Sequence, residues 1–230
     1  ARAYICGLGY YELFINGRRV GDRVLDPAYQ NYEKQAFYVA YDVTPYLREG
    51  NNTIGVRLGD GQYNQVGMSW FYYGRGFFRH GDPCMIFQLE GKMENGRPIK
   101  VVSDRRWRAT QSGALIRNQF YIGEVRDARR RNEGWSTAEY DDRRWTYARE
   151  ITGPVPHLAP MLAPPAREIR TIEPVDILEP VPGIYVVDFG EAFCGKTRLK
   201  VRAPEGTLVV QRLAQHIRNQ ELGLQKLFRE

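Results

Sequence analysis

The stretch that decides the fold reads ARAYICGLGYYELFING and spans residues 1–17. Apolar side chains alternate with other residues from Tyr4 onward, and after a shift in register at Gly7 and Gly9 the alternation resumes at Tyr11. Period-two spacing indicates a strand with one buried face, and glycines that interrupt it are typical of a bulge or bend. The sequence therefore predicts one strand that bends at its glycines.

A strong turn signal, Asn16-Gly17, follows directly. Both central residues of a type I′ turn need positive φ, so this pair predicts a hairpin whose return strand runs over 20–25. Similar patterns downstream predict further strands over 36–41, 53–58, 84–93, 98–103, 184–189, 197–201 and 207–213. One helical turn is expected over 42–47, with Thr44 at a cap position and Pro45 at the first helical position. Because helices are scarce, the predicted fold class is all-β.

Changes in composition predict three parts. Residues 1–150 hold most of the predicted strands and a long aromatic loop at 59–83. Residues 151–182 carry most of the chain's 13 prolines, which predicts an extended connector because proline cannot continue a helix. Strand patterns resume over 183–230, and that segment is too short for a sandwich core of its own. It is expected to begin a second, incomplete β-domain.

Composition and charge favour an ordered protein with a solvated surface. The chain is 43% hydrophobic and 13% aromatic, and 27 of its 33 basic residues are arginines, for a net charge of +6. Acidic residues interrupt the densest basic run at 126–131, unlike a nucleic-acid-binding stripe, so no nucleic-acid partner is expected. No run of about 18 apolar residues exists, so no membrane partner is expected either. The chain starts inside a strand pattern without Met, which suggests a processed N-terminus and leaves the compartment open.

Neither the cysteines nor the histidines show metal-ligand spacing. They are Cys6, Cys84, Cys194, His80, His157 and His216. We interpret the cysteines as small buried side chains, with one disulfide left open because spacing does not give distance, and the histidines as surface or turn residues. No metal and no cofactor are predicted.

Two acidic clusters deserve comparison with glycoside hydrolases, which use a pair of carboxylates. Glu139, Asp141 and Asp142 form one cluster, and Glu124 and Asp127 form the other. Sequence spacing does not show that two carboxylates flank a substrate, and structural ion pairs are the favoured reading. No residue is therefore assigned a catalytic role.

The loop at 59–83 is the candidate binding segment. Aromatic rings can stack on sugar rings while polar groups bind the hydroxyls, and the loop offers Trp70, Tyr72, Tyr73 and Arg75 for such contacts. The alternative is that the rings cover the core of the sandwich. Long ordered loops serve either purpose, so the substrate-binding assignment stays a hypothesis.

Three blocks of sequence occur in an order and at a spacing that are typical of one protein family. The first is GLGYYELFINGRRVG at 7–21, with LDP at 25–27, YDVT at 41–44 and GNN at 50–52; the second is YIGE at 121–124, DAR at 127–129, GW at 134–135 and YDDRRW at 140–145; the third is VDFG at 187–190, followed by Gly195. Together they resemble bacterial α-L-rhamnosidases of glycoside hydrolase family 78. Departures from the family pattern are Arg126 before DAR and EAFC at 191–194.

The resemblance implies a fold and a function. In that family a jelly-roll-like β-sandwich similar to carbohydrate-binding modules precedes a second, larger β-sandwich and an (α/α)6 barrel that holds the catalytic acids. This chain would then be the non-catalytic sandwich portion of an inverting enzyme that releases terminal α-L-rhamnose, inactive alone and partnered by the missing catalytic domain. A stand-alone module that binds a rhamnose-containing glycan is the alternative, and a hydrolase complete in these residues is the least favoured reading.

Overall fold

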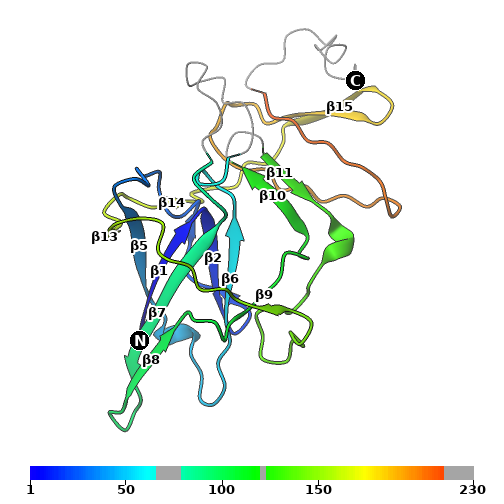
Figure 1. The fold of residues 1–230 in the computed structure, drawn as a ribbon. Coiled ribbons are helices and arrows are strands. Elements are labelled where there is room, and N and C mark those ends of the chain that lie inside the picture. Colours follow the sequence, from blue (N-terminus) through cyan, green and yellow to red (C-terminus); the bar gives the residue numbers. More distant parts are fainter. Residues whose placement is uncertain (66–78, 120–122, 215–230) are drawn as a thin grey trace. The chain divides into compact units, whose positions relative to one another are not determined.

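The computed structural model describes residues 1–65, 79–119 and 123–214 (Figure 1). Its regular structure is strand apart from two single 3₁₀ turns, η1 (Thr44–Tyr46) and η2 (Ala128–Arg130), so the predicted all-β class is confirmed. The chain divides into two compact units, Ala1–Arg167 and Glu168–Glu230.

The opening stretch forms two strands in two different sheets. β1 (Arg2–Leu8) pairs with strands of one sheet, and β2 (Tyr10–Ile15) pairs with strands of the other. Gly9 lies between them at φ +101°, and a Cβ on it would come within 2.3 Å of the Gly59 carbonyl oxygen. The predicted bend within one strand is therefore wrong in detail, because the glycine is the corner at which the chain crosses between layers.

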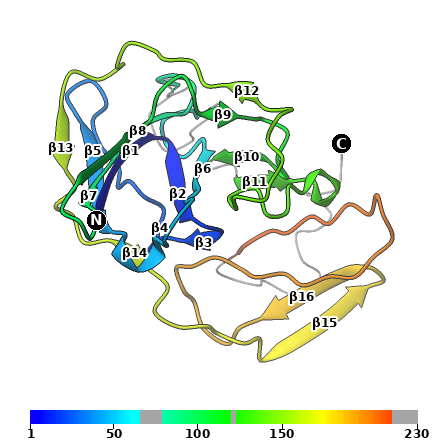
Figure 2. The same cartoon turned by 90° about the horizontal axis from the view of Figure 1, so that it is seen from below.

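Two sheets make up the body of the first unit (Figures 1 and 2). The larger sheet has the order β13 (Leu158–Pro160), β5 (Ala36–Asp42), β1, β7 (Cys84–Lys92) and β8 (Pro98–Val102). The smaller sheet has the order β3 (Arg18–Arg19), β2 and β6 (Ile54–Gly59). The hairpin of β10 (Leu115–Gln119) and β11 (Gly123–Arg126) joins the end of β6 through a bridge between Gly61 and Gln119. Two short pairs complete the unit: β4 (Arg23–Val24) with β14 (Ala166–Arg167), and β9 (Arg108–Ala109) with β12 (Thr146–Tyr147).

The core lies where the inner faces of these strands meet. Its largest side chains, at less than 2% exposure, are Phe87, Ile5, Leu13, Ile15 and Val43. The predicted face of β6, formed by Ile54, Val56 and Leu58, packs against this cluster. Alternation along β1, β2 and β6 thus places one set of side chains in the core, as period two requires.

Most predicted strand positions in this unit are confirmed within a residue or two, but the first return strand is not continuous. The Asn16-Gly17 turn has φ of +53° and +79°, as a type I′ turn requires, and it leads into two two-residue strands, β3 and β4. At η1 the predicted proline position is confirmed, whereas the cap position belongs to Val43 and makes no side-chain cap bond. Thr44 instead donates to Asp42 Oδ1.

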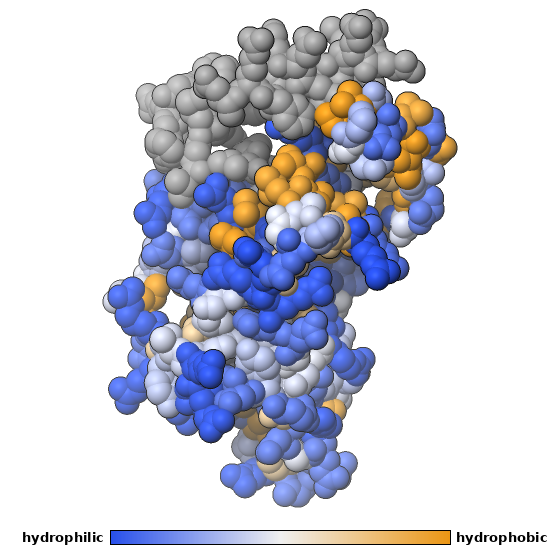
Figure 3. Space-filling view, turned by 90° about the vertical axis from the view of Figure 1, so that its right-hand side faces the viewer, coloured by the Kyte–Doolittle hydropathy of each residue, from blue (hydrophilic) through white to orange (hydrophobic). Residues whose placement is uncertain are grey.

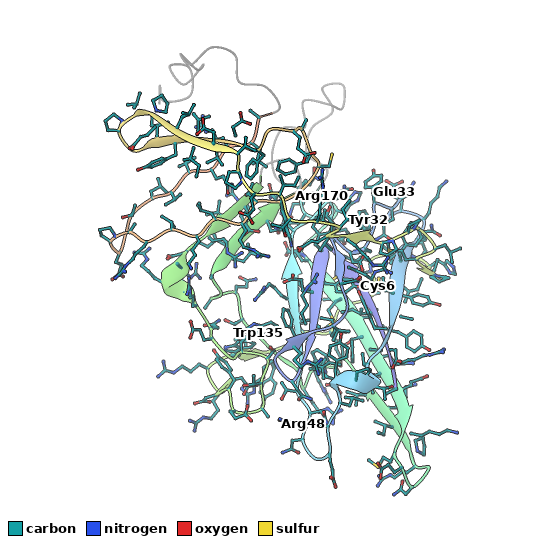
Figure 4. All side chains as sticks on the ribbon, turned by 180° about the vertical axis from the view of Figure 1, so that it is seen from behind. Cys6, Tyr32, Glu33, Arg48, Trp135 and Arg170 are labelled. Carbon is teal, nitrogen blue, oxygen red and sulfur yellow. The ribbon has the colours of Figure 1, made fainter. Side chains whose placement is uncertain are left out.

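A layer of aromatic rings covers the outer face of β2 and β6. The Phe14 and Trp135 rings lie edge to face at 5.2 Å between centroids, and Trp135 stacks on Trp145 at 6.4 Å. Figure 4 labels Trp135. A Cβ on Gly55 would come within 2.7 Å of Trp135 Cζ3, so the glycine makes room for the indole. Of the two tryptophans in the second sequence block, Trp135 therefore packs against the smaller sheet and Trp145 packs on Trp135.

The segment that leaves the first unit is bound along its edge. β13 runs parallel to β5, where the Ala36 amide donates to the His157 carbonyl at 2.8 Å and the Met161 amide donates to the Tyr38 carbonyl at 2.9 Å. Proline is tolerated in such an edge strand because one side of the strand needs no ladder bond. The proline-rich segment up to Arg167 is thus part of the first unit.

Within its described residues, 168–214, the second unit contains one hairpin, β15 (Asp176–Val181) and β16 (Ile184–Asp188). The strands expected over 197–201 and 207–213 are wrong, since neither segment forms a strand. An alternating pattern becomes a strand only when a neighbour takes up its backbone hydrogen bonds. Apolar side chains of this unit remain at the surface, and Figure 3 shows such apolar areas; the most exposed are Ile169, Leu208, Leu213 and Val175.

Candidate functional site at the base of the aromatic loop

The sequence-predicted binding residues Trp70, Tyr72, Tyr73 and Arg75 lie outside the described residues. The two ends of their loop are described, and they meet. Asn64 and Arg79 form an antiparallel bridge, and the His80 amide donates to the Tyr63 carbonyl at 2.9 Å. The candidate site is therefore built from the base of the loop.

Three rings form what we call the aromatic base: Tyr32, Tyr63 and His80. Tyr32 and Tyr63 are 7% and 3% exposed and lie edge to face at 4.9 Å, while the exposed His80 ring stacks on Tyr63 at 5.7 Å. Beneath the tyrosines lie Cys6 and other buried side chains of the second core cluster (Figure 4). The rings thus cover one end of the larger sheet and leave the histidine accessible.

Amides and a carboxylate surround this base. Asp60 accepts hydrogen bonds from Asn64 Nδ2 at 2.8 Å and from the Asn118 amide at 3.3 Å. The buried Gln119 donates through Nε2 to the Asn64 carbonyl at 3.2 Å, while its Oε1 is buried and has no partner among the described residues. An unpaired buried acceptor costs about 1–3 kcal/mol of free energy, so Gln119 Oε1 is a buried polar atom that the described residues leave unsatisfied.

Burial keeps the two phenols of the base and the two thiols near them neutral. It raises the pKa of Tyr32 to about 12, and it also raises the pKa of Tyr63. Burial, together with the neighbouring Cys84, raises the pKa of Cys6 to about 12, and burial raises the pKa of Cys84 as well. The phenols remain hydrogen-bond donors at neutral pH, and neither thiol is activated as a nucleophile.

Two aspartates of the acidic clusters stabilise surface turns by accepting hydrogen bonds from the arginine two residues later. We call these aspartate–arginine contacts turn locks. Asp127 accepts from the backbone amide, Nε and Nη2 of Arg129 at 3.0, 2.9 and 2.8 Å, and these bonds lower its pKa to about 2. Asp141 binds Arg143 in the same way, which lowers its pKa below the usual range. A glycosidase general acid needs a raised pKa, so these carboxylates do not have the properties of one.

The other members of those clusters are also bound by neighbours. Glu124 accepts from Arg126 Nη1 at 2.9 Å, and Asp142 lies 3.5 Å from Arg108 Nε. Hydrogen bonds to its own backbone amide and to Thr137 lower the pKa of Glu139. The structure therefore gives the five acids local partners.

One buried polar network was not predicted. Asp26 is 3% exposed and accepts from Arg23 Nε at 2.5 Å and from the Tyr41 hydroxyl at 3.1 Å. The Tyr41 hydroxyl lies 3.2 Å from that of Tyr11, and Arg23 also points at Met161 Sδ at 3.3 Å. The network joins β2, β5 and the exit segment. The LDP block at 25–27 contains Asp26, but the sequence does not reveal that Asp26 is buried, because its partner Tyr41 lies elsewhere in the chain.

The described residues bring together no set of three metal-ligating side chains. His80 and His157 are exposed, and His216 lies outside the described residues. All three cysteines are free; Cys194 is exposed, so its predicted burial is wrong. None of the helices in the described ranges has the length and apolar content to cross a membrane.

Comparison with known proteins shows where this architecture occurs. Residues 1–170 match the family described as the alpha-L-rhamnosidase N-terminal domain. An alpha-L-rhamnosidase of Formosa agariphila is 37% identical over 211 residues, and one of Streptomyces avermitilis is 34% identical over 218. The alignments cover 91% and 94% of this chain but 22% and 20% of those relatives, so the chain spans about a fifth of their length.

Solved structures agree. The Streptomyces avermitilis alpha-L-rhamnosidase complexed with L-rhamnose superposes with a TM-score of 0.75 at 34% identity, over 83% of this chain and 18% of that one. The alpha-L-rhamnosidase from Dictyoglumus thermophilum gives a TM-score of 0.71 at 40% identity, over 83% and 20%. The family match covers most of the chain and the fold agrees at substantial identity. This chain therefore belongs to the alpha-L-rhamnosidase N-terminal domain family.

Proposed function

We propose that this chain is the non-catalytic β-sandwich portion of an α-L-rhamnosidase, a glycoside hydrolase that releases terminal α-L-rhamnose. The observation that carries the proposal is the family match over residues 1–170 together with relatives of which the chain spans about a fifth. The bound carboxylates of the two acidic clusters support it, because Glu124, Asp127 and Asp141 are each paired with a neighbouring arginine. Catalysis, with inversion as the resemblance implies, belongs to the missing catalytic domain.

The proposed domain organisation has a sandwich over 1–150, a proline-rich connector over 151–182 whose stretch up to Arg167 pairs along the edge of the sandwich, and the start of a second sandwich over 183–230. The hairpin of β15 and β16 supports the last part, as do the exposed apolar side chains around it. Apolar groups on a sheet face gain about 25 cal/mol per Å² when another layer covers them. Further strands of the same polypeptide would supply that layer.

The proposed ligand is carbohydrate, in particular a rhamnose-containing glycan. One relative was solved in complex with L-rhamnose. In this chain the exposed His80 ring of the aromatic base lies at the base of the loop that carries Trp70 and Tyr72. Stacking on a sugar ring and acceptance from a hydroxyl are the two contacts such a ligand needs.

An activity assay tests the proposal that catalysis belongs to a domain outside these 230 residues. The 230-residue chain is mixed with an aryl α-L-rhamnoside, and release of the aryl group is followed. No turnover is expected from this chain, whereas the polypeptide extended to the length of its relatives should turn the substrate over. Turnover by the 230-residue chain would overturn the proposal.

Calorimetry tests the alternative of a stand-alone binding module. L-rhamnose and a rhamnose-containing polysaccharide are titrated into the chain, into Trp70→Ala and into Gln119→Ala. A binding module gives heat that both variants reduce, while Trp135→Phe, remote from the loop base, serves as the control. Absence of heat with both ligands would remove the sugar-binding role and leave a supporting role.

A further inference from the structure

One tripeptide, Asn-Gly-Arg, occurs twice in the sequence, at 16–18 and at 95–97. Both copies lie at hairpin turns, and their glycines have nearly the same backbone conformation, with φ of +79° at Gly17 and +81° at Gly96. In an Asn-Gly pair the backbone nitrogen of the glycine can attack the side-chain amide carbon, because no Cβ crowds the approach. The local chemistry of the two copies is therefore matched, and the surrounding structure decides which copy reacts.

The Asn16 side chain is fixed by hydrogen bonds to distant parts of the chain. Its Nδ2 donates to the Tyr46 carbonyl at 2.9 Å and to Asn52 Oδ1 at 2.8 Å, which uses both hydrogens of the amide group. Its Oδ1 accepts from the Thr53 amide at 3.0 Å. The nitrogen that would leave as ammonia is thus bound twice, and the side-chain amide cannot turn without breaking these bonds.

The glycine of this first copy is confined as well. The Gly17 amide donates to the Ser136 carbonyl at 2.9 Å, and a Cβ on Gly17 would come within 2.9 Å of Thr137 Cγ2. The Gly17 nitrogen can reach Asn16 Cγ only after the segment that carries Ser136 moves away. Such opening costs free energy, so the reaction at Asn16 is limited to the small open population.

The second copy lies at the tip of the β7–β8 hairpin, where Asn95 and Gly96 are both exposed. The Gly96 amide donates to the Met93 carbonyl of the same turn at 2.9 Å, and a Cβ on Gly96 would find nothing within 4 Å. Among the described residues Asn95 Nδ2 has no hydrogen-bond partner. The contacts that have to open before the Gly96 nitrogen can attack therefore lie within the turn itself.

Both copies hold a donor at the oxygen on which negative charge develops during the attack. The Arg97 amide donates to Asn95 Oδ1 at 3.0 Å. The Thr53 amide does the same for Asn16 Oδ1. A hydrogen-bond donor stabilises a developing oxyanion, so this contact favours the reaction at both copies. The leaving nitrogen and the freedom of the glycine make the difference between them.

We propose that Asn95 is a site of spontaneous deamidation and that the fold protects Asn16 in the same tripeptide. The Gly96 nitrogen attacks Asn95 Cγ, the Cγ–Nδ2 bond breaks, and the proton of the attacking nitrogen leaves with Nδ2 as ammonia. Water then opens the resulting succinimide ring at either carbonyl, which gives an aspartyl or isoaspartyl residue at position 95. The new carboxylate lowers the net charge from +6 to +5. The reaction is independent of the proposed function.

Mass spectrometry of the 230-residue chain tests this proposal. The folded chain is incubated in mildly alkaline buffer and digested with trypsin, and the tryptic peptides 3–18 and 93–100 are followed for the mass gain of deamidation. Deamidation should be at least about tenfold faster at Asn95 than at Asn16, since a tenfold ratio needs only about 1.4 kcal/mol of extra opening free energy at Asn16. An isoaspartyl product at position 95, separated from the aspartyl form by chromatography, identifies the succinimide route.

Two controls separate the effect of the structure from that of the local sequence. In urea that unfolds the chain, the rates at the two sites should become similar, because the tripeptide is the same. Asn52→Ala removes one acceptor of Asn16 Nδ2 and should raise the rate at Asn16 alone, with circular dichroism to check that the variant stays folded. Equal rates at the two sites in the folded chain, or a ratio that persists unchanged in urea, would overturn the proposal.

Discussion

The two compact units of this chain have similar sequence patterns and opposite packing. In the first unit alternating apolar residues meet between two sheets, and side chains such as Ile5 and Phe87 are at most 1% exposed. In the second unit the same kind of alternation leaves Leu208 84% and Val210 60% exposed. The difference teaches that alternation specifies which face can be buried, while burial itself requires a second layer.

The largest expected loss of stability comes from removing a core side chain of the first unit. Phe87→Ala should lower the free energy of unfolding by about 3–5 kcal/mol, because it removes apolar burial and leaves a cavity. Leu208→Ala in the second unit should change it by less than about 0.5 kcal/mol, since that side chain is exposed. Urea unfolding followed by circular dichroism measures both. Equal effects would break the comparison between the units.

The next effect concerns the buried ion pair that ties the first unit to its exit segment. Asp26→Asn should cost about 3 kcal/mol, because Arg23 keeps a charge in a site that is 17% exposed at the side chain. Asp22→Asn is the matched control: its partner Arg167 is exposed, and exposed pairs of this kind contribute little to stability. Thermal unfolding midpoints give the ranking. A control as destabilised as Asp26→Asn would show that burial of the pair is not the cause.

A smaller effect is expected at the corner between the sheets. Gly9→Ala places a Cβ 2.3 Å from the Gly59 carbonyl oxygen at φ +101°, so it should cost about 1–3 kcal/mol. Gly96→Ala has a similar φ of +81° but nothing within 4 Å, so it isolates the conformational part, about 1 kcal/mol. The difference between their urea midpoints measures the destabilisation caused by the close contact between residue 9 and the Gly59 carbonyl oxygen. No difference would mean that the corner can relax.

The smallest effect is the pH dependence of the turn locks. Hydrogen bonds from Arg129 lower the folded pKa of Asp127 to about 2, while its unfolded value is about 3.9. The stabilisation that ionised Asp127 contributes to the folded state is therefore complete above about pH 4 and is lost as the pH falls toward 2. As the pH falls from about 4 toward 2, the thermal unfolding midpoint of the Asp127→Asn variant should fall slightly less than that of the wild type. A steeper loss would contradict the sign of this shift.

Local signals predicted much of the first unit. Period-two spacing located β5, β6, β7 and β8, and Asn16-Gly17 predicted its turn, because these features depend on neighbours in the chain. Distant partners decided the rest. Nothing local distinguishes the buried Asp26 from the exposed Asp22, or the exposed Cys194 from the buried Cys6. The candidate site shows the same limit, since only its loop was predictable and its base required the meeting of Tyr32, Tyr63 and His80.

The sequence by itself determined the all-β class and the resemblance to the family. Only the tertiary structure decided that residues 1–17 form strands of two sheets, that the proline-rich exit segment belongs to the first unit, and that the aspartates of DAR and YDDRRW hold arginines in place. The physical reason is the range of the interactions. Propensity and periodicity act over a few residues, whereas layer assignment, burial and ion pairing depend on groups brought together from far along the chain.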